Sequence, residues 1–235
     1  MLEAVLFDWG DTLMQWTWDP ELLPAGNAAG LGVLGRPPSP ALTTLLEEAY
    51  LPRLFREGTL EEIDYPALVR EALAEAGIDV GDDELARYLE AEHAAWEPAR
   101  GLASTTHALL DTLRARGLRL GLVSNAVDPP WLLHRDLERY GVAERLDVAV
   151  FSSEIGLRKP HPAIFERALG ALGADPGRTL FVGDSLANDV GGAAALGMHT
   201  CQALWFAADD ADGAPEPDFR AFTQMDVVNV VRRLA

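Results

Sequence analysis

The stretch Ala4-Val5-Leu6-Phe7-Asp8-Trp9-Gly10-Asp11-Thr12 decides the fold, because a short apolar run ends abruptly in an acid and a glycine turn. An apolar run bounded by turn residues is typical of a strand buried on both faces. Similar runs follow at Leu118–Val123, Val148–Phe151 and Thr179–Val182, with a weaker one at Thr200–Leu204. The sequence therefore predicts a buried sheet whose first strand leads into Asp8.

Helical patterns separate these predicted strands. They cover Ser104–Arg116, Pro130–Tyr140, Pro162–Leu172 and Ala187–Leu196, and each ends at a glycine, the usual stop signal of a helix. A last covering helix is predicted at Met225–Leu234. Strands alternating with helices indicate an α/β fold, with a Rossmann-like parallel sheet and helices on both faces.

The segment from about Met14 to Pro98 breaks this alternation. It holds a Gly/Pro-rich stretch, Pro24–Pro40, and then three helical patterns without a convincing strand: Ala41–Arg56, Leu60–Ala76 and Asp82–Trp96. We predict an inserted all-helical cap at 14–98, with the core formed by 1–13 and 99–235. Because the insert leaves the sheet directly after the Asp8 strand, it is placed to cover a ligand at the strand ends.

Composition narrows the possible partners and the location. The chain has 235 residues, 49% of them hydrophobic, and a formal net charge of −18, which opposes binding to nucleic acid or to an anionic membrane. No window approaches the roughly 20 apolar residues of a membrane span, and no signal peptide is visible. The one cysteine, Cys201, fits a reducing compartment. We therefore expect a cytoplasmic protein without nucleic-acid or membrane partners.

The polar residues at the predicted strand ends indicate phosphate chemistry. Lys159 is the single lysine, whereas every other fixed basic side chain is arginine, and a lone ammonium suggests a need for a compact point charge. Asp8 ends the first strand, and Asp184, Ser185 and Asp189 follow the run that ends at Val182. Carboxylates, one amine and small hydroxyls are suited to binding a phosphate through a divalent metal.

Four segments, in this order, resemble the haloacid dehalogenase superfamily of phosphohydrolases. They are Phe7-Asp8-Trp9-Gly10-Asp11-Thr12-Leu13, Leu122-Val123-Ser124-Asn125, Arg158-Lys159-Pro160 and Val182-Gly183-Asp184-Ser185-Leu186-Ala187-Asn188-Asp189. Any one of them alone is a weak signal. Together the similarity spans nearly the whole core, Met1 to Leu13 and about Gly101 to Ala235.

The resemblance implies a covalent mechanism and a metal. Asp8 is implied as the nucleophile that becomes an aspartyl phosphate, with Lys159 pairing both with it and with a phosphate oxygen. Mg²⁺ is implied as the cofactor, held by Asp8, the Gly10 carbonyl and Asp184, with Asp189 completing or orienting the ligands. Thr12, Ser124 and Asn125 are implied to bind the substrate. The substrate class is a small phosphorylated metabolite.

Several of these residues also have a purely structural interpretation. Asp184 with Ser185 is suited to capping the next helix, and Asp189 to being an ordinary acid in its first turn. Ser124 and Asn125 are also typical of a plain turn. Only the occurrence of all these residues together favours catalytic roles over structural ones.

One departure from the family pattern concerns proton transfer. Phosphatases of this family usually place a second Asp two residues after the nucleophile, where it protonates the leaving oxygen, but Gly10 stands there and Asp11 follows it. A general acid is worth about 10² to 10⁴ in rate, so its loss should either slow turnover or favour leaving groups that need little protonation, such as those of aryl or acyl phosphates. Asp11 either replaces the missing acid or caps the loop.

Alternative activities are open to different degrees. A carbon–phosphorus hydrolase of the superfamily draws a lysine from its cap, and no lysine lies between Met14 and Pro98. A dehalogenase needs no metal, so Asp184 and Asp189 would have no function in it. A phosphomutase usually needs the second Asp that is missing here, so it ranks lower. A receiver-type module places its metal-binding acids before the phosphorylated Asp, the reverse of the order here. A further alternative is that this chain binds phosphate without catalysing its hydrolysis.

The substrate pocket is the least readable part. The two junctions of the insert carry three tryptophans, Trp16, Trp18 and Trp96. They either stack on a base, sugar or aryl ring of the substrate or pack the hinge between insert and core. Arg53, Arg56 and His93 are placed to reach an anionic substrate from the cap, or else to form a solvated helix face.

Overall fold

The core is a six-stranded parallel sheet in the order β5-β4-β1-β6-β7-β8. The computed structural model describes residues 1–54, 59–206 and 215–234, so Arg56 lies outside the described residues. The strands are β1 (Ala4–Phe7), β4 (Arg119–Ser124), β5 (Val148–Phe151), β6 (Thr179–Gly183), β7 (His199–Ala203) and β8 (Phe219–Ala221). The predicted parallel α/β core is confirmed. The edge strand β8 was not predicted, because three residues are too short to form a pattern.

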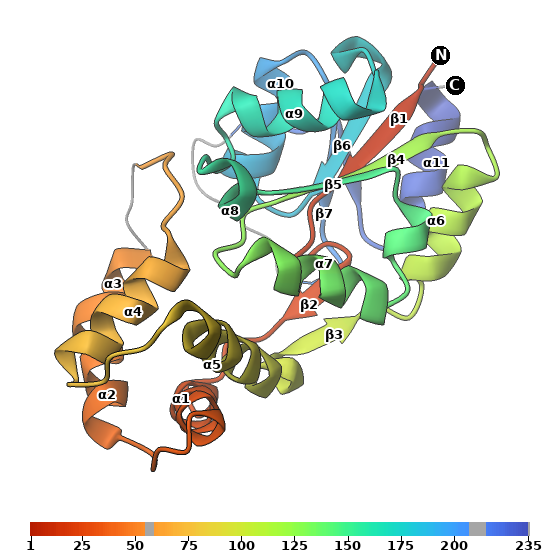
Figure 1. Ribbon diagram of the computed structural model, residues 1–235. Helices are drawn as coiled ribbons and strands as arrows, with labels where there is room; N and C mark the ends of the chain where they lie inside the picture. The colour runs from red at the N-terminus through yellow and green to blue at the C-terminus, as the bar shows by residue number, and fades with distance from the viewer. Residues whose placement is uncertain (55–58, 207–214, 235) are drawn as a thin grey trace.

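Helices cover both faces of the sheet (Figure 1). On one face lie α6 (Thr106–Arg114), α7 (Pro130–Arg139) and α11 (Asp226–Leu234), against Val5 and Phe7 of β1. On the other lie α9 (Pro162–Leu172) and the short α10 (Gly192–Ala195), against Ala4 and Leu6. A four-residue helix, α8 (Ser152–Ile155), follows β5. Alternate residues of β1 thus face two separate apolar layers, which explains its unbroken hydrophobic run.

The insert is helical and has its own apolar core. It contains α1 (Leu22–Val33), α2 (Pro40–Leu45), α3 (Leu51–Leu54), α4 (Tyr65–Glu75) and α5 (Asp82–Ala95), with a π-helical turn at Leu46–Tyr50 between α2 and α3. Leu31, Leu73 and Tyr88 are buried in this core. Leu132 of α7 belongs to the same cluster, so the insert packs against the core domain through that helix.

Helix α1 covers much of the Gly/Pro-rich stretch Pro24–Pro40, for which we predicted no helix. The glycines there allow close helix packing, since a Cβ added to Gly30 would lie 2.6 Å from the Tyr88 ring of α5. Glycine is unfavourable in an isolated helix, so the sequence pattern alone favours a loop. The contact with α5, nearly sixty residues away in the chain, reverses that preference.

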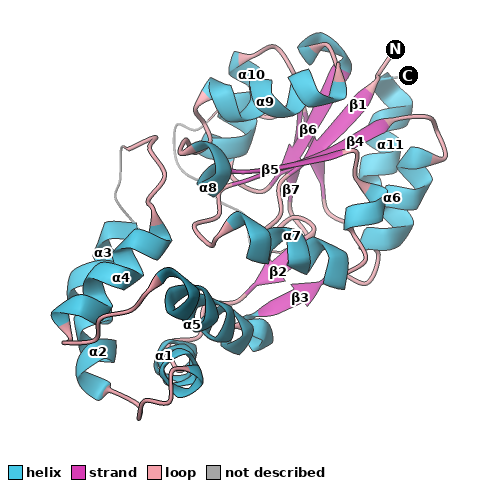
Figure 2. Ribbon diagram, viewed as in Figure 1, coloured by secondary structure: helices cyan, strands magenta, loops and turns pink. Residues whose placement is uncertain are grey.

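A two-stranded antiparallel ribbon joins the insert to the core. It pairs β2 (Met14–Trp16) with β3 (Arg100–Leu102), and Figure 2 shows it between the sheet and the helices of the insert. The prediction that 14–98 contains no strand was therefore wrong at its first three residues, because this pairing joins segments more than eighty residues apart. We propose that the unit boundaries predicted at 13/14 and 98/99 lie at this ribbon.

The described helices are all short. The longest, α5, has 14 residues, against about 20 for a membrane crossing. Within residues 1–54, 59–206 and 215–234, no helix is both long enough and apolar enough to span a bilayer.

Candidate active site

The site forms where three neighbouring strands end. Phe7 of β1 lies in register with Leu122 of β4 on one side and with Val182 of β6 on the other. The backbone N–H of Asp8 donates to the Val182 carbonyl at 2.9 Å, which extends the strand pairing to the acid. Parallel strands end at one edge of the sheet, so Asp8 lies beside Ser124 at the end of β4 and Asp184 just after β6.

Lys159 is buried among the acids. Its Nζ lies 2.6 Å from Asp8 Oδ1 and 2.7 Å from Asp189 Oδ1, and the residue is only 3% exposed. Burial alone acts to lower the pKa of Lys159, but the charges of Asp189 and Asp8 outweigh burial and raise it. The amine is therefore a permanent positive charge between two carboxylates.

Asn125 holds the backbone of that lysine. Its Oδ1 accepts the Lys159 N–H at 2.7 Å and its Nδ2 donates to the Lys159 carbonyl at 3.2 Å. We predicted Asn125 as a substrate-binding residue, and this stays a prediction, since Asn125 also lines the adjoining pocket. Its amide contacts link the end of β4 to the backbone of the lysine.

Three carboxylates converge beside the amine. One oxygen from each of Asp8, Asp184 and Asp189 lies within 4.8 Å of the others. Asp189 lies in a π-helical turn, Leu186–Gly191, and its Oδ2 accepts the N–H of Ser185 at 3.0 Å. A π-helical turn is often found at a functional site.

Gly183 makes this approach possible, a role that we did not predict. A Cβ at that position would overlap the Asp189 carboxylate far inside van der Waals contact. The glycine between the apolar run of β6 and Asp184 is the signal that points to such a close approach.

The charges of the cluster do not balance. Three acids face one amine, and burial together with the charges of Asp8 and Asp189 raises the pKa of Asp184. Burial also raises the pKa of Asp189, against the opposing effect of Lys159. A divalent cation among these oxygens would remove the excess negative charge, and carboxylate oxygens are ligands that Mg²⁺ prefers. The residues present therefore fit such an ion.

Two hydroxyls predicted to bind substrate lie at the same edge. Ser124 is 3% exposed at the end of β4 and lines the adjoining pocket. Thr12 is fully buried, and its carbonyl accepts hydrogen bonds from Trp205 Nε1 at 2.8 Å and Gln224 Nε2 at 3.2 Å. Among the described residues, the Thr12 hydroxyl has no hydrogen-bond partner.

Asp11 and Gly10 form the turn after the nucleophile. Asp11 has a φ of 52°, and its Oδ1 accepts the N–H of Trp16 at 3.1 Å. Partial burial raises the pKa of Asp11, with a further contribution from the charge of Asp8 and an opposing one from the Trp16 hydrogen bond. We predicted Asp11 as catalytic with loop capping as the alternative. The hydrogen bond of its Oδ1 is of the loop-capping kind, but Asp11 also lines the adjoining pocket, so its catalytic part stays a prediction. At Gly10, an added Cβ would meet no atom within 4 Å.

A pocket of about 770 Å³ opens beside this turn, between the core and the insert. Gly10, Asp11 and Ser124 line it, as do Trp16, Trp18 and Trp96. The three indole rings pack on one another, as the hinge interpretation expects, and stacking on a substrate ring stays a prediction. Arg53 instead pairs with Glu71 at 3.0 Å and does not line the pocket.

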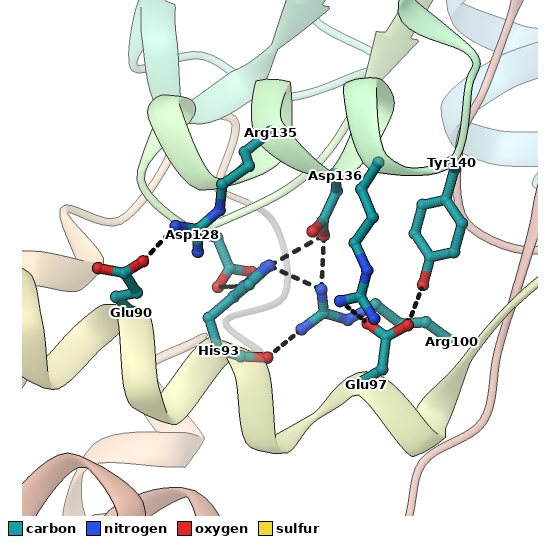
Figure 3. A network of polar contacts seen from close by, with 9 residues as sticks. Glu90, His93, Glu97, Arg100, Asp128, Arg135, Asp136 and Tyr140 are labelled. Atoms are coloured by element: carbon teal, nitrogen blue, oxygen red, sulfur yellow. Dashed lines mark hydrogen bonds and ion pairs between the residues drawn. The ribbon is translucent and has the colours of Figure 1, made fainter.

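A buried ionic network closes one side of the pocket and joins the insert to the core (Figure 3). His93 of α5 places Nδ1 2.7 Å from Asp128 Oδ1 and Nε2 2.9 Å from Asp136 Oδ2 on α7. Arg100 Nη1 lies 2.5 Å from the same Asp136 oxygen and 2.6 Å from His93 Nε2. We did not predict this network, because its partners lie 35 and 43 residues from His93 without a common motif.

The network predicts a pH-dependent stability. Burial acts to lower the pKa of His93, and so does the charge of Arg100. Hydrogen bonds to Asp128 and Asp136 outweigh both effects and raise this pKa from 6.5 to about 9. Because the folded pKa exceeds the unfolded one, protonated His93 stabilises the fold fully below the unfolded pKa, and this stabilisation is lost as pH rises through the folded pKa. The shift corresponds to about 3 kcal/mol.

His93→Gln should therefore lower the free energy of unfolding most at about pH 6 and little above about pH 9, as measured by urea titration. His107→Gln, at an exposed histidine of α6, is the control. An effect of His93→Gln that is constant across this pH range would contradict the ionic origin of the stabilisation.

Comparison with known proteins agrees with the geometry of the site. Residues 2–197 match the family model described as haloacid dehalogenase-like hydrolase. Since the match covers most of the chain, the protein belongs to the haloacid dehalogenase-like hydrolase family.

The similar proteins include phosphatases and a dehalogenase by name. Glyceraldehyde 3-phosphate phosphatase of Methanothermobacter thermautotrophicus is 31% identical over 204 residues, covering 84% of each chain. The enzyme of the same name from Methanopyrus kandleri is 29% identical over 247 residues, covering 100% of this chain and 99% of the relative. The crystal structure of 2-haloacid dehalogenase from Pseudomonas syringae pv. Tomato DC3000 is 25% identical, with a TM-score of 0.70 over the full length of both chains.

Proposed function

We propose that this enzyme is a Mg²⁺-dependent phosphohydrolase that cleaves a small phosphomonoester through an aspartyl phosphate at Asp8. The observation that carries the proposal is the contact of Lys159 with Asp8 and Asp189, beside Asp184, at the edge of the sheet that opens toward the pocket. Two relatives named as phosphatases, of which the chain covers 84% and 99%, support the same reaction class.

The first chemical step is a displacement at phosphorus by Asp8. Lys159 holds Oδ1 of Asp8, which leaves the second carboxylate oxygen for the attack. The bond from that oxygen to phosphorus forms as the ester P–O bond breaks. Water then attacks the aspartyl phosphate, releases orthophosphate and restores the carboxylate, so one difficult displacement becomes two easier ones.

The ammonium of Lys159 and the hydroxyls at the strand ends stabilise the transferring group. Lys159 provides a fixed positive charge in a buried site, where such a charge acts strongly and needs no reorganisation. We propose that Ser124 and Thr12 bind the phosphoryl oxygens, with Asn125 holding the lysine in position.

The carboxylate cluster would hold the metal. Asp8, Asp184 and the backbone carbonyl of Gly10 are the proposed ligands, with Asp189 completing or orienting them. When bound, Mg²⁺ lets a carboxylate and a phosphate approach each other and neutralises charge on the transferring group.

The dehalogenase named among the structural relatives is the second candidate, because its fold matches along the whole chain. A 2-haloacid is itself an anion, and its entry would add another negative charge to a cluster in which three acids already face one amine. Without a cation this arrangement disfavours such a substrate. Release of halide from a 2-haloacid in the absence of Mg²⁺, with no release of phosphate from esters, would favour the dehalogenase.

Metal removal tests the proposal. A chelator is expected to reduce phosphate release from para-nitrophenyl phosphate to background, and Mg²⁺ should restore it. Asp184→Asn should weaken Mg²⁺ binding by at least roughly 100-fold. Mg²⁺ should also raise the unfolding temperature of the wild-type protein but not of Asp184→Asn, a readout that needs no turnover.

Asp83→Asn, at an exposed acid of α5, is the matched control for the metal experiment. It should bind Mg²⁺ like the wild type. Undiminished activity in the presence of chelator would overturn the metal-dependent reaction. Phosphate binding without any turnover would instead favour the non-catalytic alternative.

A further inference from the structure

The pocket beside the nucleophile turn has an aromatic wall. The indole rings of Trp16 and Trp96 stack with centroids 5.7 Å apart, and Trp18 lies 5.2 Å from Trp96. All three rings line the same pocket as Gly10, Asp11 and Ser124. A flat apolar group attached to a phosphate at Asp8 would therefore enter a pocket that contains this wall.

Two of the three tryptophans are accessible to solvent, whereas Trp96 is only 9% exposed. Trp18 is 49% exposed and Trp16 is 37% exposed, although both rings belong to one aromatic cluster at the root of the insert. Tryptophan buries a large apolar area when it is covered, so exposed indoles in a concave site indicate a surface that a ligand covers.

Most charged groups of the pocket wall are paired with protein partners, whereas Asp11, among the described residues, accepts only the N–H of Trp16. His93 and Arg100 face Asp128 and Asp136, as described above. The Tyr65 hydroxyl donates to Glu92 at 2.5 Å, and Arg158 lies 3.5 Å from Glu62 outside the pocket. Apart from Asp11, the wall thus offers apolar area and paired charges, which favours an uncharged organic group.

The residue at position 10, a glycine, also favours an ester with an aromatic leaving group. Gly10 offers no side chain to protonate a leaving oxygen, and Oδ1 of the neighbouring Asp11 already accepts the N–H of Trp16. A phenol such as that of tyrosine has a pKa of about 10, against about 16 for water and simple alcohols of similar acidity. An aryl oxygen therefore leaves as a stable anion where an alkyl oxygen needs a proton.

We propose that the preferred substrates are aryl phosphomonoesters whose ring lies against Trp16, Trp18 and Trp96, a conclusion that rests on the proposed phosphohydrolase activity. Asp8 forms the new P–O bond while the bond to the aryl oxygen breaks, and the electron pair leaves with that oxygen as a phenolate. Water then displaces Asp8 from phosphorus, and its second proton goes through solvent to the phenolate. The products are a phenol and orthophosphate.

Phenyl phosphate and benzyl phosphate separate the two parts of this proposal. Both esters carry the same ring, but the leaving group is a phenolate in phenyl phosphate and an alkoxide in benzyl phosphate. The wild-type enzyme with Mg²⁺ should show a kcat/KM for phenyl phosphate at least roughly 100-fold above that for benzyl phosphate. Glyceraldehyde 3-phosphate, the ester in the name of two relatives, should be slower than phenyl phosphate.

Two variants test the residues. Gly10→Asp should raise the ratio of kcat for benzyl phosphate to kcat for phenyl phosphate roughly 10- to 100-fold, since the turn has room for a side chain. Trp18→Ala should raise the KM of both aromatic esters roughly two- to tenfold. Trp131→Ala is the control, because Trp131 is 45% exposed on α7 and does not line the pocket.

The outcomes distinguish this inference from the proposed function. Similar kcat/KM values for phenyl and benzyl phosphate, or a preference for glyceraldehyde 3-phosphate, would overturn the aryl preference and leave the phosphohydrolase intact. Absence of phosphate release from every ester would overturn the proposed function itself. The wild-type comparison needs no variant, so the inference stays testable if a variant fails to fold.

Discussion

The Asp8→Asn variant is expected to release phosphate at least about 10⁴-fold more slowly than the wild type, because no other group can replace the attacking carboxylate oxygen. Asparagine has nearly the same shape, so the turn after β1 should persist. Its amide is not a nucleophile, however, and it gives Lys159 a neutral partner where a carboxylate lies 2.6 Å away. Single-turnover measurements with para-nitrophenyl phosphate give the rate.

Two controls accompany this variant. Thermal unfolding should show that Asp8→Asn is folded, and Asp83→Asn should retain wild-type turnover. A rate for Asp8→Asn within tenfold of the wild type would remove Asp8 from the chemistry and assign the attack to another group or to water.

Lys159→Met is expected to have the second largest effect, with kcat lowered by at least about 10³-fold. The change removes the buried positive charge between Asp8 and Asp189 and leaves mutually repelling carboxylates. Phosphate, itself an anion, then approaches an uncompensated acidic cluster. Initial rates at saturating Mg²⁺ measure the loss.

Lys159→Arg separates charge from shape. The planar guanidinium is larger than an ammonium and cannot act as a point charge between two oxygens, and Lys159 Nζ also lies 5.6 Å from the centroid of the Phe181 ring. The arginine variant should therefore remain at least about 10²-fold impaired. Near-normal activity of Lys159→Arg would show that any nearby positive charge is sufficient.

The core strands could be predicted from sequence because burial on both faces leaves a local signature. Ala4–Phe7 and Val148–Phe151 form strands over the predicted residues. The β2–β3 ribbon and α1 could not be predicted, since their stability comes from contacts distant in sequence. Gly30 against Tyr88 is the clearest case, because a residue that disfavours an isolated helix is required by the helix that packs on it.

The candidate site was predictable only in part. The acids and the lysine follow recognisable strand ends, and the structure brings Asp8, Lys159 and Asp189 into contact. The roles of the turn residues depend on backbone geometry, so the hydrogen bond from Trp16 to Asp11 has no sequence signature. The His93 network likewise arises from tertiary packing of α5 against α7.

The covalent intermediate provides the most direct measurement of the central claim. Enzyme mixed with Mg²⁺ and an aryl phosphate, quenched in acid within one turnover and digested, should yield one peptide heavier by a single phosphoryl group. Fragmentation should place that group on Asp8, and Asp8→Asn should give no such peptide. Active enzyme that carries the phosphoryl group on another residue, or that forms no phosphorylated peptide at any quench time, would contradict the account.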